Sequence, residues 1–241
     1  LGSGSSAKTG YLLDAFAAPG VRYVPVDVSA SALRGAAAAI AAGRPHVQVI
    51  GINGVYEEAL PLLPVLSPAL LIFLGSTIGN LDEVESAAFW ELVAASLGPG
   101  DHMLLGIDLV KDPAVLEAAY DDAAGVTRRF TKNYFVRMNR ELGAGLDVDA
   151  IEHEARYDRE SERMVIHARF MRDQVVHVRP LGLHVPIAAG ERLLVEISRK
   201  FRVERMRREL ERYGLETVRT FTDGREWFAL LLLRKVEHGK D

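Results

Sequence analysis

The first 110 residues alternate between short apolar runs and longer amphipathic stretches. The apolar runs have the length and bounds of buried strands and lie at residues 22–27, 46–51, 69–74 and 102–108. Helical spacing occupies the intervening stretches at residues 8–16, 29–42 and 83–97. Ser29 or Ser31 caps the second of these helices and Gly43 ends it. This alternation predicts an α/β fold with a parallel, doubly wound sheet.

The pattern changes after residue 110. Asp112 and Pro113 form a good helix start, and Gly143 ends the helical region that follows. Antiparallel strands are then predicted at residues 155–157, 163–172, 174–180 and 193–198. The chain closes with a helix at 203–213 and a hairpin of strands 216–222 and 227–233. We therefore predict a nucleotide-type domain at 1–110 and 201–241, with an α+β domain inserted at 111–200.

Composition narrows the class of protein. The chain has 241 residues, 49% of them hydrophobic, and a net charge of −4, which gives no basic footprint for nucleic acid. It has no cysteine, and its seven histidines lack metal-ligand spacing, so neither thiolate chemistry nor a metal site is expected. No apolar run reaches the roughly 18 residues that a membrane span needs. We expect a cytoplasmic, monomeric bacterial enzyme.

The chain opens on a glycine-rich turn at residues 1–9, a kind of turn that normally joins a buried strand to a helix and approaches a nucleotide-like ligand. Three ligand classes fit it. A phosphate loop would have Ala7 in place of its second glycine, and a dinucleotide fingerprint would place Asp27 on a ribose hydroxyl. An S-adenosylmethionine fold would use Asp27 similarly, and the terminal hairpin favours it. The strand before the turn is reduced to Leu1, so we expect an N-terminal segment that carries it.

Particular strings then match a known family in order along the chain. They lie at residues 2–9, 27–31, 73–81, 108–112, 120–127, 139–144 and 196–198. Together they resemble the histidine Nα-methyltransferases of ergothioneine biosynthesis, and the string from Ser76 to Asn80 is more specific than any glycine turn. The resemblance implies a Rossmann-like class I methyltransferase sheet with a terminal antiparallel hairpin and an inserted substrate domain. It also implies S-adenosyl-L-methionine as cofactor and conversion of L-histidine to trimethylated hercynine.

The resemblance assigns several residues to the cofactor. The family has an Asp–Phe pair at the adenine, where this chain has Val55 and Tyr56. Tyr56 keeps the aromatic face, but the Val55 side chain cannot accept a hydrogen bond, so that contact is lost or has moved to the backbone or to Glu57. The residues implied at the cofactor are Gly2, Lys8, Asp27, Val55, Tyr56 and Gly75.

For the substrate, the resemblance gives Asn80 and Tyr120 to the amino acid's carboxylate and amine, and both are the catalytic candidates. It gives Glu196 and Ser198 to the imidazole. Residues two apart on a strand face the same way, so this carboxylate and hydroxyl can hold both ring nitrogens. A methionine common near the imidazole in the family corresponds to Ile166, which changes the shape of the expected pocket.

The implied reaction is an in-line displacement at the sulfonium methyl by a neutral α-amine, with Tyr120 orienting the nitrogen lone pair or relaying its proton. Two alternatives stay open: methylation of another amino acid such as tryptophan, which Glu196 argues against, and a non-catalytic ligand-binding fragment. Structural roles are also open. Asn80 suits a turn, Glu196 can pair with Arg199 or Lys200, and the basic run at 199–208 suits the solvated face of a helix.

Overall fold

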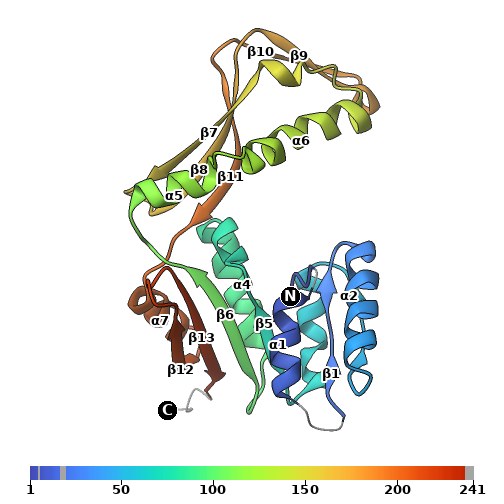
Figure 1. The fold of residues 1–241 in the computed structure, drawn as a ribbon, viewed down its shortest axis with the longest axis vertical. Helices are drawn as coiled ribbons and strands as arrows, with labels where there is room; N and C mark the ends of the chain where they lie inside the picture. The colour runs from blue at the N-terminus through green and yellow to red at the C-terminus, as the bar shows by residue number, and fades with distance from the viewer. Residues whose placement is uncertain (5, 17–19, 237–241) are drawn as a thin grey trace. The chain divides into compact units, whose positions relative to one another are not determined.

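A computed structural model describes residues 1–4, 6–16 and 20–236, which form two compact units (Figure 1). The first unit combines Leu1–Thr77, Glu83–Ile107 and the chain from Val203 onward, and the second combines Ile78–Asp82 with Asp108–Arg202. The sequence placed borders near residues 110 and 200 but assigned 78–82 to the first domain. Ser5 of the opening turn and residues 237–241 of the predicted first domain lie outside the described residues.

The first unit contains parallel strands with helices, followed by a C-terminal helix and hairpin. Its elements are α1 (Ala7–Ala15), β1 (Arg22–Tyr23), β2 (Val26–Asp27), α2 (Ala30–Gly43), β3 (Gln48–Val49), β4 (Ile52–Asn53), α3 (Tyr56–Ala59), a 3₁₀ turn (Leu60–Leu66), β5 (Leu70–Phe73), α4 (Glu83–Ser96), β6 (His102–Asp108), α7 (Val203–Glu211), β12 (Leu215–Thr222) and β13 (Phe228–Lys235).

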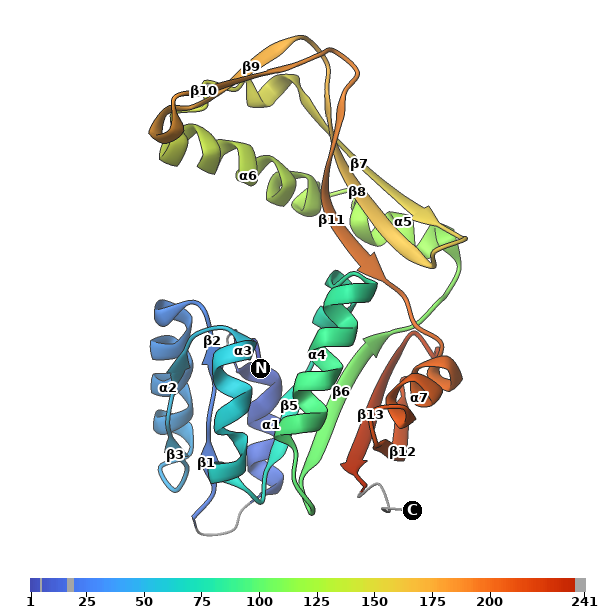
Figure 2. The same cartoon turned by 180° about the vertical axis from the view of Figure 1, so that it is seen from behind.

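Strand pairing confirms the predicted α/β class. A four-stranded sheet has the order β12-β13-β6-β5, with β5 and β6 parallel and β12 and β13 antiparallel (Figures 1 and 2). Two further parallel pairs join β1 to β3 and β2 to β4. The predicted single strand at 22–27 was wrong in detail, because Pro25 lacks a backbone N–H and lies between β1 and β2.

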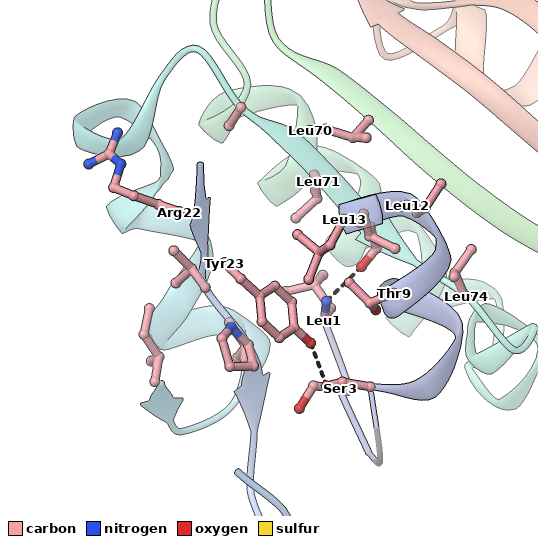
Figure 3. A pocket seen from close by; sticks show the side chains of 18 of the residues that line it. Leu1, Ser3, Thr9, Leu12, Leu13, Arg22, Tyr23, Leu70, Leu71 and Leu74 are labelled. Carbon is pink, nitrogen blue, oxygen red and sulfur yellow. Dashed lines mark hydrogen bonds between the residues drawn. The ribbon is translucent and has the colours of Figure 1, made fainter. Parts of the chain in front are cut away.

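The first three residues lie between β2 and β5, which belong to separate sheets. The Leu1 nitrogen donates to the Ile72 carbonyl at 2.6 Å, and the Ser3 N–H donates to the Val26 carbonyl at 3.1 Å. Beside them is a cavity of about 750 Å³ with apolar side chains around it, Leu13 among them (Figure 3). The opening turn is therefore held by both sheets at one edge of this cavity.

The second unit is built on antiparallel strands, as the sequence predicts. Its elements are a 3₁₀ turn (Thr77–Asn80, whose first residue belongs to the first unit), α5 (Pro113–Tyr120), α6 (Val126–Leu142), a 3₁₀ turn (Val148–Ala150), β7 (Ile151–Asp158), β8 (Arg163–Phe170), β9 (Gln174–Val178), a 3₁₀ turn (Arg179–Leu181), β10 (Leu183–Ile187) and β11 (Arg192–Arg199). The sheet order is β11-β8-β7, and β9 pairs with β10. We did not predict β10, because Pro186 interrupts its pattern and its residues are mostly exposed.

One apolar core holds α6 against the strands of this unit. Phe135 of α6 packs edge-on against Phe170 of β8, with ring centroids 5.9 Å apart. Ile151 and Ala168 are completely buried beside them. Gly143 adopts a φ of +66° where α6 ends, as its predicted capping role requires. The sheet that carries β11 is thus packed against α6 through this core.

Candidate functional site

Asp27 anchors the glycine-rich turn. Its Oδ2 accepts the Gly4 N–H at 3.0 Å, and its Oδ1 accepts the Ser29 N–H at 2.9 Å. Ser29 in turn caps α2 by accepting the Ala32 N–H at 3.2 Å. One carboxylate at the end of β2 therefore fixes both the turn and the start of α2. This internal role of Asp27 was not predicted from its residue type or spacing.

Tyr56 lies next to the turn. Its ring packs edge-on against Phe73 and Phe89, with centroids 5.4 and 5.9 Å away. A Cβ placed on Gly2 would lie 3.5 Å from the Tyr56 hydroxyl. Burial raises the pKa of Tyr56, and the negative charges of Asp27 and Glu57 raise it further. Three of the predicted cofactor residues, Gly2, Asp27 and Tyr56, are thus close together.

The other cofactor candidates are Lys8, Val55 and Gly75. Gly75 follows β5 with a φ of +82°, which favours glycine, and Lys8 is exposed in the first turn of α1. Gly2, Lys8 and Gly75 line the cavity of about 750 Å³. Val55 is 43% exposed, and neither Val55 nor Asp27 nor Tyr56 is among the lining residues. Its N–H donates to the Glu58 carboxylate at 3.3 Å, so Glu58 rather than Glu57 contacts it.

These residues fit an adenosyl group better than a phosphate. The Asp27 carboxylate already takes the Gly4 N–H, and its negative charge repels a phosphate at the turn. The Ser3 hydroxyl is buried at the turn and, within the described residues, has no hydrogen-bond partner. The Asp27 carboxylate has further lone pairs that can accept from ribose hydroxyls. The Tyr56 ring suits contact with a flat base, and Gly2 has no side chain that would obstruct the ligand.

Tyr120 and Ser198 meet in the second unit. The Tyr120 hydroxyl donates to the Ser198 Oγ at 2.8 Å, although 78 residues separate them in the sequence. The Lys200 ammonium donates to both oxygens, each at 2.8 Å, and lies 4.7 Å from the centre of the Tyr120 ring. Two of the predicted substrate residues therefore belong to one hydrogen-bonded cluster.

Lys200 is a residue that the sequence interpretation missed. Its side chain is 0% exposed and forms an ion pair with Asp108 at 2.9 Å. The assignment of residues 199–208 to a solvated helix face was therefore wrong for Lys200, which follows β11 and lies before α7. The useful signal was the spacing 196, 198, 200, because alternate residues of an extended chain share one face.

Glu196 lies on β11, directly across from Ile166 of β8. Its carboxylate is half-buried and makes no hydrogen bond or ion pair with any other described residue, so neither Arg199 nor Lys200 pairs with it directly. Burial raises the pKa of Glu196, and the positive charge of Lys200 opposes that rise. The Glu196 carboxylate is partly desolvated and has no partner among the described residues, so a hydrogen bond from a ligand N–H would be favourable there.

The free energy of unfolding should respond when Glu196 is replaced by glutamine. A carboxyl with a raised folded pKa contributes stability that is complete below its unfolded pKa and is lost as pH rises through the folded value. Glu196→Gln should therefore stabilise the free protein at neutral pH, by less than about 1 kcal/mol because solvent screens the group. Urea unfolding should show the gain at neutral pH and lose it near the carboxyl's ordinary pKa of about 4.3. An equal gain at both pH values would contradict this origin.

Asn80 lies at the exposed end of its 3₁₀ turn in the second unit. The preceding residue, Gly79, approaches β11 so closely that a Cβ would lie 2.8 Å from the Arg199 carbonyl oxygen. Glycine is therefore required there for a close backbone approach, which brings the turn to the end of β11. Residues 76–80 therefore form a turn, and this does not conflict with the expectation that Asn80 contacts the substrate.

A buried histidine forms a hydrogen bond to the backbone of Tyr120. The His153 Nε2 lies 2.8 Å from the Tyr120 carbonyl, which can only accept, so this nitrogen carries the proton. The His153 Nδ1 then accepts from the Thr131 hydroxyl at 3.0 Å. Both side chains are buried, so α6 and β7 together fix the end of α5. The sequence interpretation counted His153 only among scattered histidines.

Thr131→Val should lower stability more than its small change in volume suggests. The valine leaves the buried His153 Nδ1 without its donor, at a cost of about 1–3 kcal/mol. Urea unfolding monitored by circular dichroism measures this difference. Thr220→Val is the matched control, because Thr220 is exposed on β12 and its replacement should change stability by less than about 0.5 kcal/mol. Equal effects of the two substitutions would show that the bond to His153 contributes nothing.

The candidate residues therefore form two sets. Gly2, Asp27 and Tyr56 belong to the first unit with the other cofactor candidates, whereas Asn80, Tyr120, Glu196 and Ser198 all belong to the second. No helix among residues 1–4, 6–16 and 20–236 has the length and apolar character to cross a bilayer. The same residues contain no group of three or more histidine, aspartate or glutamate side chains placed to hold a metal ion.

Comparisons with known proteins give relatives over almost the whole chain. Residues 1–235 match the profile of a family described as histidine-specific methyltransferase, SAM-dependent. The chain is 45% identical over 234 residues to the histidine N-alpha-methyltransferase of Mycolicibacterium smegmatis, covering 96% of this chain and 73% of the relative. For the enzyme of the same name from Mycobacterium tuberculosis, the identity is 44% over 98% of this chain and 74% of the relative. Ergothioneine biosynthesis protein 1 of Neurospora crassa is 30% identical over 98% of this chain and 27% of the relative.

Proposed function

Because the chain belongs to the family of histidine-specific, SAM-dependent methyltransferases, we propose that it methylates the α-amino nitrogen of L-histidine. Three successive transfers from S-adenosyl-L-methionine would give the betaine hercynine, a step of ergothioneine biosynthesis. The high identity to two histidine N-alpha-methyltransferases over almost the whole chain supports this substrate.

The observation that carries the substrate proposal is the pair Glu196 and Ser198 on one face of β11. Glu196 offers an unpaired, half-buried carboxylate, and Ser198 offers a hydroxyl anchored by Tyr120 and Lys200. An imidazole has one N–H and one bare nitrogen, so it can satisfy both groups together. A side chain without these groups would leave Glu196 partly desolvated and unpaired, which costs affinity.

The remaining residues position the reactants. S-adenosylmethionine, when bound, supplies an electrophilic sulfonium methyl. Gly2, Asp27 and Tyr56 would hold its nucleoside, with Lys8 and Gly75 nearby. Asn80 and Tyr120 would hold the carboxylate and amine of histidine, so that the neutral amine directs its lone pair at the methyl group. Loss of one ammonium proton from the substrate precedes each attack, and Tyr120 would orient the resulting lone pair.

Mass spectrometry of the products tests the proposal. The protein is incubated with S-adenosylmethionine and equal concentrations of histidine and tryptophan. We expect mono-, di- and trimethyl-histidine to form in sequence, with tryptophan unmodified. Methylated tryptophan alone would overturn the substrate, and products that stop at monomethyl-histidine would overturn the three transfers. If both amino acids stay unmodified although S-adenosylhomocysteine binds in calorimetry, the chain is a ligand-binding unit and not the proposed enzyme.

The proposal includes a monomer in the cytoplasm. The absence of cysteine suits a reducing compartment. Light scattering of the purified protein tests the first point: a mass near 26.5 kDa supports the monomer, and twice that value contradicts it.

A further inference from the structure

Lys200 uses its entire hydrogen-bonding capacity inside the second unit. An ammonium has three N–H donors and no acceptor. Its three partners are the Tyr120 hydroxyl at 2.8 Å, the Ser198 Oγ at 2.8 Å and the Asp108 Oδ2 at 2.9 Å. A cation with a fully buried side chain persists only when it is paired and hydrogen-bonded in this way. Lys200 therefore has no N–H left for a ligand.

The same contacts leave one hydroxyl proton of the Tyr120–Ser198 pair for a ligand. Tyr120 and Ser198 each accept one bond from Lys200, and their oxygens lie 2.8 Å from each other. Two hydroxyls carry two protons, and one of these joins the two oxygens. Tyr120 donates in that bond, so the Ser198 proton is the one that remains for a ligand.

We propose that Lys200 is a positioning residue that makes Ser198 a hydrogen-bond donor to the substrate ring, beside the acceptor Glu196. This inference rests on the proposed histidine methyltransferase function. With Lys200 in place, Ser198 and Glu196 present one donor and one acceptor, which match a ring with one N–H and one bare nitrogen. Without Lys200, both hydroxyls regain a free lone pair and can rotate, so Ser198 no longer has a fixed polarity.

Asp108 gives this arrangement a second support. Its carboxylate accepts from Lys200 and is also in close contact with Lys111 three residues later. Lys111 thus shares the carboxylate of Lys200. Lys111 is therefore a matched control for the loss of a positive charge next to Asp108.

Calorimetric titration of histidine in the presence of saturating S-adenosylhomocysteine tests the proposal without any turnover. Lys200→Met should weaken histidine binding about tenfold, the effect of misaligning one neutral hydrogen bond. Ser198→Ala should weaken it by a similar factor. The double variant should be no weaker than Ser198→Ala within about twofold, because Lys200 acts through Ser198. Lys111→Met should change histidine affinity by less than about twofold.

The outcomes separate this proposal from the proposed function and from a purely structural role. If the unaltered protein fails to bind histidine, both proposals are overturned. If it binds histidine and Lys200→Met binds equally well, or if the losses in Lys200→Met and Ser198→Ala multiply, only the role of Lys200 is overturned. Should Lys200→Met fail to fold, Asp108→Asn/Lys200→Met removes the Lys200 charge together with the carboxylate that it pairs with. The same tenfold loss, with S-adenosylhomocysteine affinity unchanged within about twofold, is expected from that variant.

Discussion

Glu196→Ala is expected to lower kcat/KM for histidine by at least about 100-fold, the largest effect predicted within the second unit. A hydrogen bond from a ring N–H to a carboxylate contributes about 1.5–3 kcal/mol, and the alanine also leaves the ring nitrogen without a partner. Most of the loss should appear in KM, because the imidazole contact is present in both the ground state and the transition state. Steady-state rates with isotopically labelled S-adenosylmethionine measure both parameters.

The control for this substitution is Glu152→Ala. Glu152 is exposed on β7 of the same sheet, so its removal should change kcat/KM by less than about twofold. Binding of S-adenosylhomocysteine should be the same in both variants, because Glu196 belongs to the second unit and the cofactor candidates to the first. If Glu196→Ala retains the histidine KM within threefold, the imidazole must be recognised elsewhere.

Asp27→Ala is expected to weaken S-adenosylhomocysteine binding by about 100-fold and also to lower stability. The alanine removes a proposed acceptor for the ribose and leaves the N–H groups of Gly4 and Ser29 without their partner. Each lost internal bond costs about 1 kcal/mol, so the stability loss should be about 1–2 kcal/mol. Calorimetry with S-adenosylhomocysteine and urea unfolding measure the two effects separately.

Two further variants sharpen that test. Asp27→Asn retains one carbonyl oxygen and should lose less stability than Asp27→Ala, while its binding remains impaired because an amide nitrogen cannot accept from the ribose. Asp14→Asn alters an exposed carboxylate of α1 that pairs with Arg44, and cofactor affinity should change by less than about twofold. Unchanged affinity in Asp27→Ala would remove Asp27 from the proposed cofactor site.

Much of the fold could be predicted because it is encoded locally. Helix α4 and strand β6 have the apolar spacing and bounding residues that their secondary structure requires, and the turn at Asp223 joins the predicted hairpin. The pair Glu196 and Ser198 was also visible, because alternation along one strand places both on one face. Strand β10 could not be predicted, because its residues are mostly exposed and it contains a proline, so it lacks the alternating apolar pattern of a strand.

The supporting contacts of the site could not be predicted, because each joins residues far apart in the sequence. Lys200 donates a hydrogen bond to Tyr120, 80 residues away in the sequence, and forms an ion pair with Asp108. In the sequence alone, it is one cation in a basic run. The link from Thr131 through His153 to Tyr120 likewise depends on how α5, α6 and β7 pack together. Residue types and spacing identify the groups that a ligand would meet, whereas tertiary packing decides which buried groups orient them.

The position of Leu1 and Ser3 between β2 and β5 has a consequence for how the first unit opens. These residues donate one backbone bond to each of two separate sheets, on the same turn that would receive the cofactor. A ligand seated on that turn would restrain both sheets at once, so its binding energy would also oppose their separation. Amide hydrogen exchange in β1 to β4 would then slow together with that in β5 on ligand binding, as one cooperative unit.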